Sequence, residues 1–542
     1  MKVNMLILIS ISSILTVSAS APILSLSRVE EWFCKFNADD EELYRNEFPN
    51  EKAFESFGPL IPRFECPDEN IERVYYFRWW TYRKHLRRVK GGSGWVVTEF
   101  LPNVSWAGAE NTISCPFGHH IREGRWISNS EFIDGYIDFM LKKGAINGPR
   151  SYLNWPARSA FERAKVTGDL RFVQDRLEDF VRNFDAWCKG WTVKSLSLAQ
   201  VENRERVKGV PLQAGFREER GLFDFVGDRE GSEFALSQDG ARPFVNAAMW
   251  AESTAISEIA RSSGHNDVAV RFAKVASCLE KRIKAQLWNP RKEFFTVLSV
   301  RGKLDDVCEL SGYAPFYFGM DLKGYENAWK HIMDERGFFA PVGLTFPMRD
   351  TPGFDVSIDL NHHACMWNGP SWPYATSIAL TGLYESLQSG LSIPVNASDF
   401  AKLVKQYAAQ HRHVREDGRV VPWIDENLDP FTGEWTARRH MLEWDRKGIR
   451  KLSYRERGKD YNHSTFCDLV IAGLCGFVPQ INGSIVVRPL APKEWAWWCI
   501  DGIRYHGYNV TVLFDRDGIR YGMGQGLVVL KDGKPTKNGD LK

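Results

Sequence analysis

Apolar side chains recur at steps of three and four residues through the middle of the chain. One stripe runs over residues 170–187 and a second over residues 268–287. Shorter stripes with the same period cover residues 132–140, 245–259, 378–387 and 466–474. This spacing gathers apolar side chains on one face of a helix, so the pattern predicts a series of amphipathic helices.

Long connections rich in glycine, proline and aromatic residues separate these stripes, notably residues 98–126 and 352–372. Helices joined by alternately short and long loops are typical of helical hairpins stacked into a toroid, whose long loops gather at one end. No short-period repeat is present, which argues against a solenoid. The pattern therefore predicts a mostly α protein.

The sequence pattern changes from helical periodicity to short β-type runs at about residue 478. Residues 484–487, 510–514 and 526–530 are short β-branched or alternating runs, and Asp-Gly pairs mark tight turns between them. We therefore divide the chain as follows: a signal peptide over 1–21, a segment packed on the barrel over 22–95, a helical barrel over 96–478 and a β-rich appendage over 479–542.

The N-terminus has the form of a targeting segment. Lys2 precedes an apolar run over residues 5–17, and small residues follow at 18–21. The run is short for a membrane span and typical of a cleaved signal peptide, with an uncleaved anchor as the alternative. We therefore expect a secreted or lumenal protein (endoplasmic reticulum, lysosome or extracellular space) that is free of the membrane after cleavage.

Two further features bear on this compartment. Five Asn-x-Ser/Thr sequons could carry glycans, and they lie at Asn103, Asn396, Asn462, Asn482 and Asn509. The compartment would also permit several disulfides among the 10 cysteines. No pair of cysteines has CxxC spacing, so zinc-finger chemistry is not expected.

Composition narrows the function only slightly. The formal net charge is +2 and no basic tract stands out, so nucleic acid is not an expected partner. Aromatic residues make up 13% of the chain, with 20 tryptophans. Flat aromatic faces pack against the C–H surface of sugars, although tryptophans serve equally well in a core.

Three acidic clusters are candidates for chemistry. They cover residues 228–234, residues 423–434, and the pair Glu110 and Glu123. Hydrolysis of a glycosidic bond needs two carboxyl groups, one to protonate the leaving oxygen and one to activate water or attack the anomeric carbon. Acidic runs are otherwise solvated loops, so the neighbouring residues decide between these interpretations.

The segments around these acidic residues resemble motifs of a known family. The segment W-N-G-P-S-W-P at 367–373 resembles the W-x-G-P-x-W motif of the (α/α)-barrel glycosidases, a group that includes trehalase, processing α-glucosidase I and mannosylglycerate hydrolase. E-N-L-D-P-F-T-G at 426–433 resembles their E-N/Q-Y-x-P-x-T-G segment, and E-G-S-E-F at 230–234 resembles S-G-x-D-x-S. The likeness covers roughly residues 95–479 and is greatest to the mannosylglycerate-hydrolase type.

The resemblance implies an (α/α)6 barrel with a small C-terminal antiparallel β domain, and an inverting, exo-acting α-glycosidase. It implies that Glu426 is the general base and that Glu233 takes the position of the general acid, where the family usually has Asp. Asp228 and Glu230 are alternative acids. We expect Asn427 or a nearby arginine to keep the base ionised.

Further residues are candidates for the sugar subsites, because they combine aromatic faces with hydrogen-bonding groups. They are Trp367, Asn368, Gly369, Trp372, Trp106, Trp79, Trp80, Arg83, His119, His120, His363, Asn427 and His463. We predict that Trp367, Trp372 and at least one of Trp79, Trp80 and Trp106 line the cavity of Glu426. Residues 460–464 should open a helix, with Asn462 or Ser464 as its N-cap.

Two other functions stay open. A sugar epimerase or polysaccharide lyase on the same kind of barrel would use His119, His120, His362 or His363 as acid and base. A non-catalytic sugar-binding relative is the third hypothesis. None of the three requires a cofactor, and the paired histidines lack a third ligand at metal-site spacing, so no metal is expected.

Overall fold

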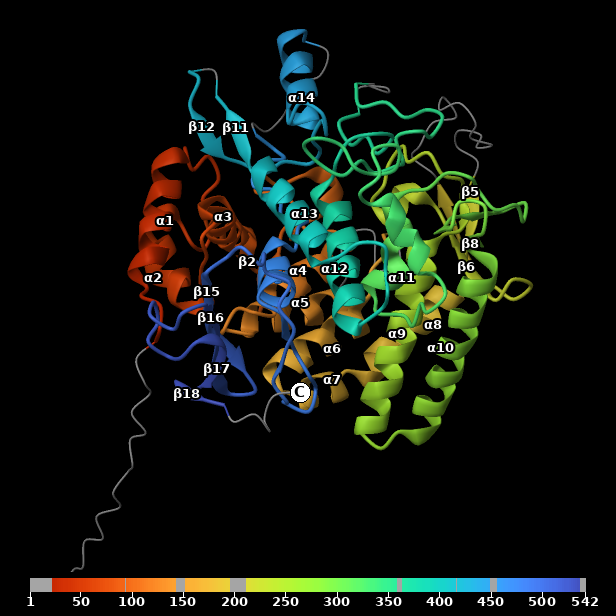
Figure 1. The fold of residues 1–542 in the computed structure, drawn as a ribbon. Coiled ribbons are helices and arrows are strands. Elements are labelled where there is room, and N and C mark those ends of the chain that lie inside the picture. The colour runs from red at the N-terminus through yellow and green to blue at the C-terminus, as the bar shows by residue number, and fades with distance from the viewer. Residues whose placement is uncertain are drawn as a thin grey trace, which may run out of the picture.

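The computed structural model describes residues 22–92, 94–142, 152–194, 211–357, 363–415, 417–448 and 456–536 (Figure 1). The predicted signal peptide lies outside the described residues. No helix of the described part combines the length and the apolar character that crossing a membrane requires.

Helices are the main element of the structure. They are α1 Ser27–Asp39, α2 Ala53–Phe57, α3 Glu69–His85, α4 Phe117–Gly124, α5 Glu131–Lys142, α6 Pro156–Thr167, α7 Leu170–Gln174, α8 Leu177–Cys188, α9 Pro243–Ser262, α10 Asn266–Gln286, α11 Ala314–Tyr317, α12 Pro373–Ser389, α13 Ala397–Gln410, α14 Thr436–Arg446 and α15 Phe466–Asp468, which continues as a π-helical segment over Leu469–Leu474.

Helix contacts close a ring. Helix α4 packs on α6, α6 on α9, α9 on α11, α11 on α12, α12 on the π-helical segment after α15, and α15 again on α4. Outer helices cover this ring, as α10 covers α9 and α13 covers α12 (Figure 1). The predicted mostly α fold of the (α/α)6-barrel class is therefore confirmed.

The sequence pattern explains which helices lie inside. Helix α9 is buried along most of its length, whereas α10 buries Ala269, Phe272, Ala276, Leu279 and Ile283. These five side chains recur at steps of three and four, so one face of α10 packs inward and the other meets solvent. The predicted stripe over residues 268–287 coincides with this helix.

Short strands complete the chain. They are β1 Arg63–Glu65, β2 Leu86–Arg88, β3 Trp95–Val97, β4 Trp191–Lys194, β5 Pro211–Arg217, β6 Leu222–Phe225, β7 Gly240–Ala241, β8 Trp288–Asn289, β9 Phe294–Phe295, β10 Leu298–Ser299, β11 Arg412–Val414, β12 Val420–Pro422, β13 Phe477–Val478, β14 Val486–Val487, β15 Trp497–Tyr505, β16 Tyr508–Asp515, β17 Gly526–Lys531 and β18 Lys534–Pro535.

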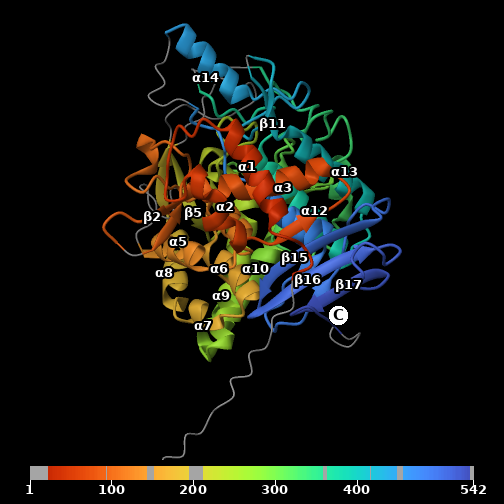
Figure 2. The ribbon, with the colours of Figure 1, turned by 90° about the vertical axis from the view of Figure 1, so that its left-hand side faces the viewer.

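The small C-terminal antiparallel sheet is present as predicted, in the order β1-β15-β16-β17-β18 (Figure 2). Strand β1 comes from the N-terminal segment and pairs with β15, Arg63 opposite Asp501. The N-terminal segment is thereby joined to the last part of the chain. Strand β15 has no counterpart among the runs that the sequence singled out.

Three local predictions need correction. A second antiparallel sheet, in the order β10-β7-β6-β5-β4, lies within the region expected to be only helical. Helix α4 lies inside the connection predicted over residues 98–126. Helix α15 begins after Thr465 without a side-chain cap, because Asn462 binds Arg78 and Ser464 binds the Tyr407 hydroxyl.

None of the disulfides that the proposed compartment would permit is present among the cysteines, all of which lie in the described residues. All 10 are free in the structure, and most are buried among apolar side chains.

Candidate active site

A cavity of about 360 Å³ brings together the acidic and aromatic motifs of the sequence. Its walls come from loops far apart along the chain: those after β3 and β6, those before α12 and α15, and the loop after β12. Its lining includes Glu99, Phe100, Trp106, Cys115, Tyr152, Arg229, Glu233, His363, Cys365, Trp372, Tyr374, Glu426, Arg457, Tyr461 and His463.

Glu233 reaches this cavity from the loop that follows β6. The chain turns through Gly231 with φ +88° and Phe234 with φ +61°, a backbone region that glycine tolerates and Phe rarely adopts. The Glu233 carbonyl accepts a hydrogen bond of 3.1 Å from the amide of Trp367. The acid loop is thereby fastened to the W-N-G-P-S-W segment.

The surroundings of Glu233 favour its protonated form. Burial raises its pKa to about 8, and the negative charges of Asp228 and Glu426 act in the same direction. At neutral pH the side chain therefore carries a proton that it can donate.

Glu426 lies in the same cavity and has a cation, the guanidinium of Arg457, as its partner. The Arg457 guanidinium donates to Glu426 Oε2 at 2.6 Å, and the Cys365 thiol donates to Oε1 at 3.3 Å. The Glu426 amide donates to Asp425 Oδ1 at 2.9 Å, which fixes the backbone. A carboxylate that is only 2% exposed needs such a cation to stay charged.

Glu99 is a third carboxyl group in the cavity, and no sequence motif marks it. It accepts a hydrogen bond of 2.9 Å from the indole N–H of Trp106. Burial raises its pKa to about 8, and the charge of Glu426 contributes. At neutral pH Glu99 can therefore donate a hydrogen bond as well as accept one.

Aromatic side chains form much of the wall. Trp372 and Trp106 line the cavity, as predicted for these two. Trp367 does not: it stacks on Trp372 at 4.0 Å between ring centroids, with Phe346 against its edge. Trp367 therefore supports the wall from behind, which corrects the expectation that it faces the cavity.

The alternative acids lie elsewhere. Neither Asp228 nor Glu230 lines the cavity. Arg242 donates to Glu230 Oε2 at 2.6 Å, and the Val245 amide donates to Oε1 at 3.0 Å near the start of α9. Glu230 is thus held in a buried ion pair. Asp228 is fully buried.

The aromatic and basic candidates of α3 serve packing. Trp79 is fully buried, with its ring edge-on to Tyr75 and Tyr82. The indole of Trp80 donates to Asn37 at 2.8 Å. Arg83 donates to the Phe48 carbonyl and to Asn50. Trp80 and Arg83 thus face α1 and the loop that follows it, Trp79 packs among tyrosines of its own helix, and none of the three lines the cavity.

Some of the histidine candidates line the cavity and others do not. His363 and His463 line the cavity, and burial holds the pKa of His463 well below its usual value. His119 stacks on Tyr374 at 4.4 Å, and burial lowers its pKa to about 4. His120 contacts Tyr136 and stays outside the lining. His362 lies outside the described residues.

The remaining candidates have structural positions. Asn427 donates to the Ala364 carbonyl and accepts from the Ala437 amide at the start of α14. Asn368 is buried beside the cavity wall, and a side chain at Gly369 would meet the Asp355 carbonyl at 2.5 Å. Glu123 accepts from two backbone amides of α15.

Arg457 was anticipated only as an unnamed arginine, and Glu99 and Cys365 were not anticipated. Arg457 precedes the polar segment at 460–464, so that segment was the signal available for it. Glu99 and Cys365 are single residues in loops without a motif. Their role follows from tertiary contacts alone.

The arrangement can perform acid–base chemistry. Burial raises the pKa of the Glu233 carboxyl group, and a guanidinium hydrogen-bonds the Glu426 carboxyl group, within one cavity of mixed aromatic and polar walls. Two carboxyl groups with such different surroundings are what general acid and general base catalysis need.

Comparison with known proteins adds a family. A model described as a mannosylglycerate hydrolase MGH1-like glycoside hydrolase domain matches residues 109–464, more than half of the chain. A solved structure named sialidase is 32% identical with a TM-score of 0.80, and the match covers 96% of this chain and 44% of that one.

Two more distant structures are similar as well. A GH78 family rhamnosidase of a Bacillus species is 11% identical with a TM-score of 0.49, covering 84% of this chain and 40% of that one. A GH63 mannosylglycerate hydrolase from Thermus thermophilus, in complex with glucose, is 11% identical with a TM-score of 0.38, covering 82% and 98%. The chain spans less than half the length of the sialidase and the rhamnosidase.

Proposed function

The chain belongs to the mannosylglycerate hydrolase MGH1-like glycoside hydrolases, and we propose that it is an inverting, exo-acting α-glycosidase whose acid is Glu233 and whose base is Glu426. The observation that carries the proposal is that one cavity holds both carboxyl groups, Glu233 with a pKa raised by burial and Glu426 hydrogen-bonded to the guanidinium of Arg457.

In the proposed reaction, each of the two glutamates transfers one proton. Glu426, ionised beside Arg457, accepts a proton from a water molecule as that water attacks the anomeric carbon. Glu233 gives its proton to the glycosidic oxygen as the bond between that oxygen and the anomeric carbon breaks. The sugar leaves with inverted configuration, and the two carboxyl groups have exchanged their proton states.

The walls fit a sugar ring. Trp372 and Trp106 offer apolar faces, while Glu99, His463 and Arg229 offer hydrogen-bonding groups around them. Arg229 lies over the Tyr152 ring at 4.9 Å. A cavity of this size supports action on a terminal sugar, which is the basis for proposing an exo mode.

The substrate and the cellular compartment of the protein are proposals as well. We propose secretion or entry into a lumenal compartment on the strength of the N-terminal apolar run. The name sialidase belongs to a longer protein, of which this chain matches less than half. Sialosides therefore belong in the substrate screen beside α-mannosides, α-glucosides and α-rhamnosides.

The histidine chemistry of a lyase or epimerase has less support. Of the four histidines that it would use, His119 and His120 do not line the cavity. His363 lines it and has its ring nitrogen against the Cys365 carbonyl at 3.1 Å.

The test is a screen of the purified protein against natural and aryl glycosides, with the first-formed anomer identified by proton NMR. An α-glycoside should release the β-anomer first. Release of the α-anomer would contradict inversion, and no hydrolysis of any glycoside would contradict the function.

A further inference from the structure

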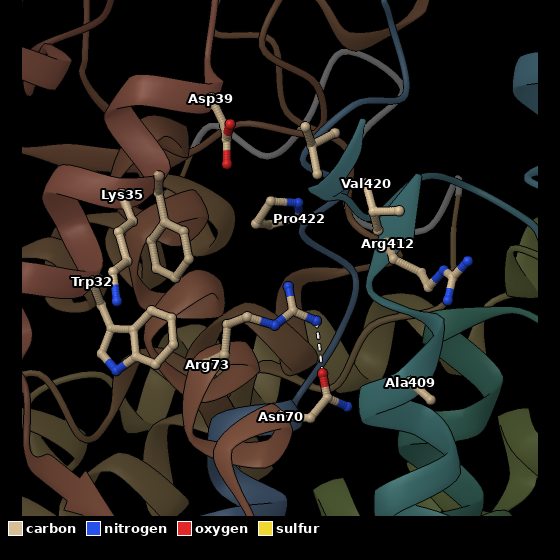
Figure 3. A pocket seen from close by; sticks show the side chains of 11 residues that line it. Trp32, Lys35, Asp39, Asn70, Arg73, Ala409, Arg412, Val420 and Pro422 are labelled. Atoms are coloured by element: carbon tan, nitrogen blue, oxygen red, sulfur yellow. Dashed lines mark hydrogen bonds between the residues drawn. The ribbon is translucent and has the colours of Figure 1, made fainter. Parts of the chain in front are cut away.

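The structure has a second cavity, of about 570 Å³ (Figure 3). It lies between α1, α3 and the end of α13, with the β11–β12 hairpin as its other wall. Its lining and the lining of the catalytic cavity have no residue in common. The residues that carry the argument are Trp32, Phe36, Asp39, Asn70, Arg73 and Pro422.

Arg73 is the central cation of this second cavity. Figure 3 shows its guanidinium pointing into the space, with one donor directed to Asn70 Oδ1 at 2.7 Å. It also reaches the His411 carbonyl at 3.5 Å. Over the described residues, Arg73 forms no ion pair. A guanidinium has five N–H donors, so most of them remain available to a ligand.

The environment makes the charge of Arg73 costly without a partner. Burial lowers its pKa, and the positive charge of Arg412 on the rim acts in the same direction, with only partial compensation from Glu69. An anionic group bound in the cavity would relieve both effects.

A carboxylate faces the same space from the opposite side. In Figure 3 Asp39, at the end of α1, points toward the cavity from above Arg73. Its backbone carbonyl accepts from Arg415, whereas its carboxylate takes part in no ion pair of the described chain. The carboxylate can therefore accept hydrogen bonds from a ligand's hydroxyl groups.

Apolar surface lies between these two charges. Phe36 and Pro422 form walls, and Trp32 lies below with the Lys35 ammonium 4.6 Å from its ring centroid. The cavity thus offers an anion partner, a hydroxyl acceptor and apolar contact within one open hollow. That combination matches a sugar ring that bears a carboxylate.

We propose that this second cavity binds an acidic sugar unit, with the sugar carboxylate on Arg73 and its hydroxyl groups on Asp39 and Asn70. Most of the named lining residues, from Trp32 to Arg73, precede the region that the family model matches. The side chains proposed to bind the ligand therefore belong to the N-terminal segment, and the end of α13 and the β11–β12 hairpin, within the matched region, complete the walls.

Calorimetric titration with two matched probes tests the proposal. D-glucuronate and D-glucose share a ring and differ in the carboxylate, so glucuronate should bind about tenfold or more tightly, as expected for a charge-assisted hydrogen bond. Acetate, titrated at the same ionic strength, has the charge without the ring and should bind more weakly than glucuronate.

Variants locate the binding. Arg73→Gln should abolish the preference for glucuronate, Asp39→Asn should weaken glucuronate binding, and the exposed Arg504→Gln should leave it unchanged. Asp39→Asn decides the matter if Arg73→Gln does not fold. Equal binding of glucose and glucuronate, equal binding of acetate, absence of glucuronate binding, or unaltered binding in both site variants would overturn the proposal.

Discussion

Glu233 and Glu426 line one cavity, yet their surroundings differ. Glu233 has burial and two neighbouring negative charges, which raise its pKa to about 8. Glu426 has the guanidinium of Arg457 at 2.6 Å. Because the difference comes from neighbours and not from residue type, either role could be lost through a change that leaves the glutamate itself in place.

The acid role predicts a dependence on the leaving group. Glu233→Gln should lower turnover of a natural glycoside by about 10²–10⁴, since the alcohol leaves only when protonated. An aryl glycoside with an acidic phenol should lose much less. The measurement is kcat on both substrates, with the exposed Glu218→Gln as control. Equal losses on the two substrates would contradict the acid role.

The same pKa predicts the alkaline limb of the pH profile. Glu233 must carry its proton to act, so kcat/KM for a natural glycoside should fall as the pH rises through about 8. The limb should be weak for the aryl glycoside with an acidic phenol, because that group leaves without a proton. A fall that is equally steep for both substrates would place the limb on another group.

At the residue scale, the sequence was informative where residues form a motif. Glu233 and Glu426 stand in segments that resemble known ones, and the structure brings both to one cavity. Glu99 stands alone in its loop, so only the folded chain shows its place beside Glu426. Trp79 and Trp80 failed as subsite candidates because a helix face can be aromatic for packing alone.

At the scale of elements, the loop between β12 and α14 determines where Glu426 lies. Asp425 binds Arg438 of α14 through two hydrogen bonds of 2.9 and 2.8 Å, and its other oxygen accepts the Glu426 amide. Asn427 accepts from the Ala437 amide, and Asp429 accepts from Phe431 and Thr432. Much of the E-N-L-D-P-F-T-G segment is therefore used to shape the loop.

The ion pair in this loop predicts a stability effect. Arg438→Gln should lower the free energy of unfolding by about 3–5 kcal/mol, because it leaves the fully buried carboxylate of Asp425 without its cation. The neighbouring Arg439→Gln removes a largely exposed pair with Glu434 and should cost less than about 1 kcal/mol. Urea denaturation of the two variants measures the difference, and similar losses would contradict the assignment.

At the scale of the whole molecule, the periodicity of apolar residues indicated a mostly α protein and located α9, α12 and the region of α15, but it missed the ring helices α4, α6 and α11. It could not reveal the sheet of β4–β7 and β10, because β7 and β10 have only two residues each and α9 and α10 separate them along the chain. Nor could it show that β1 crosses to pair with β15, because such a pairing depends on the folded ring between them.

The buried carboxyl groups predict how stability depends on pH. Glu252 of α9 accepts the amides of Ala157 and Arg158 at the start of α6, and burial raises its pKa from 4.5 to about 8. Because the pKa of Glu252 in the folded protein exceeds its unfolded value, the contribution of Glu252 to the free energy of unfolding is complete below about pH 4.5 and is lost as the pH rises through about 8.

Glu252→Gln keeps the shape and removes the titration. The decline of the free energy of unfolding with rising pH, over the window from about pH 5 to pH 8, should become shallower by about 1 kcal/mol per pH unit. Urea unfolding at several pH values measures it, with the exposed Glu258→Gln of the same helix as control. An unchanged slope would show that Glu252 is ionised in the folded protein.

The central claim is that Glu426 is the base of a glycosidase, and turnover of Glu426→Gln on the best natural glycoside tests it most directly. The amide keeps the shape but cannot take a proton, so kcat should fall by about 10²–10⁴ while substrate binding is largely retained. Glu434→Gln, in the same loop but exposed, should keep wild-type turnover. Near-wild-type turnover in Glu426→Gln would contradict the mechanism.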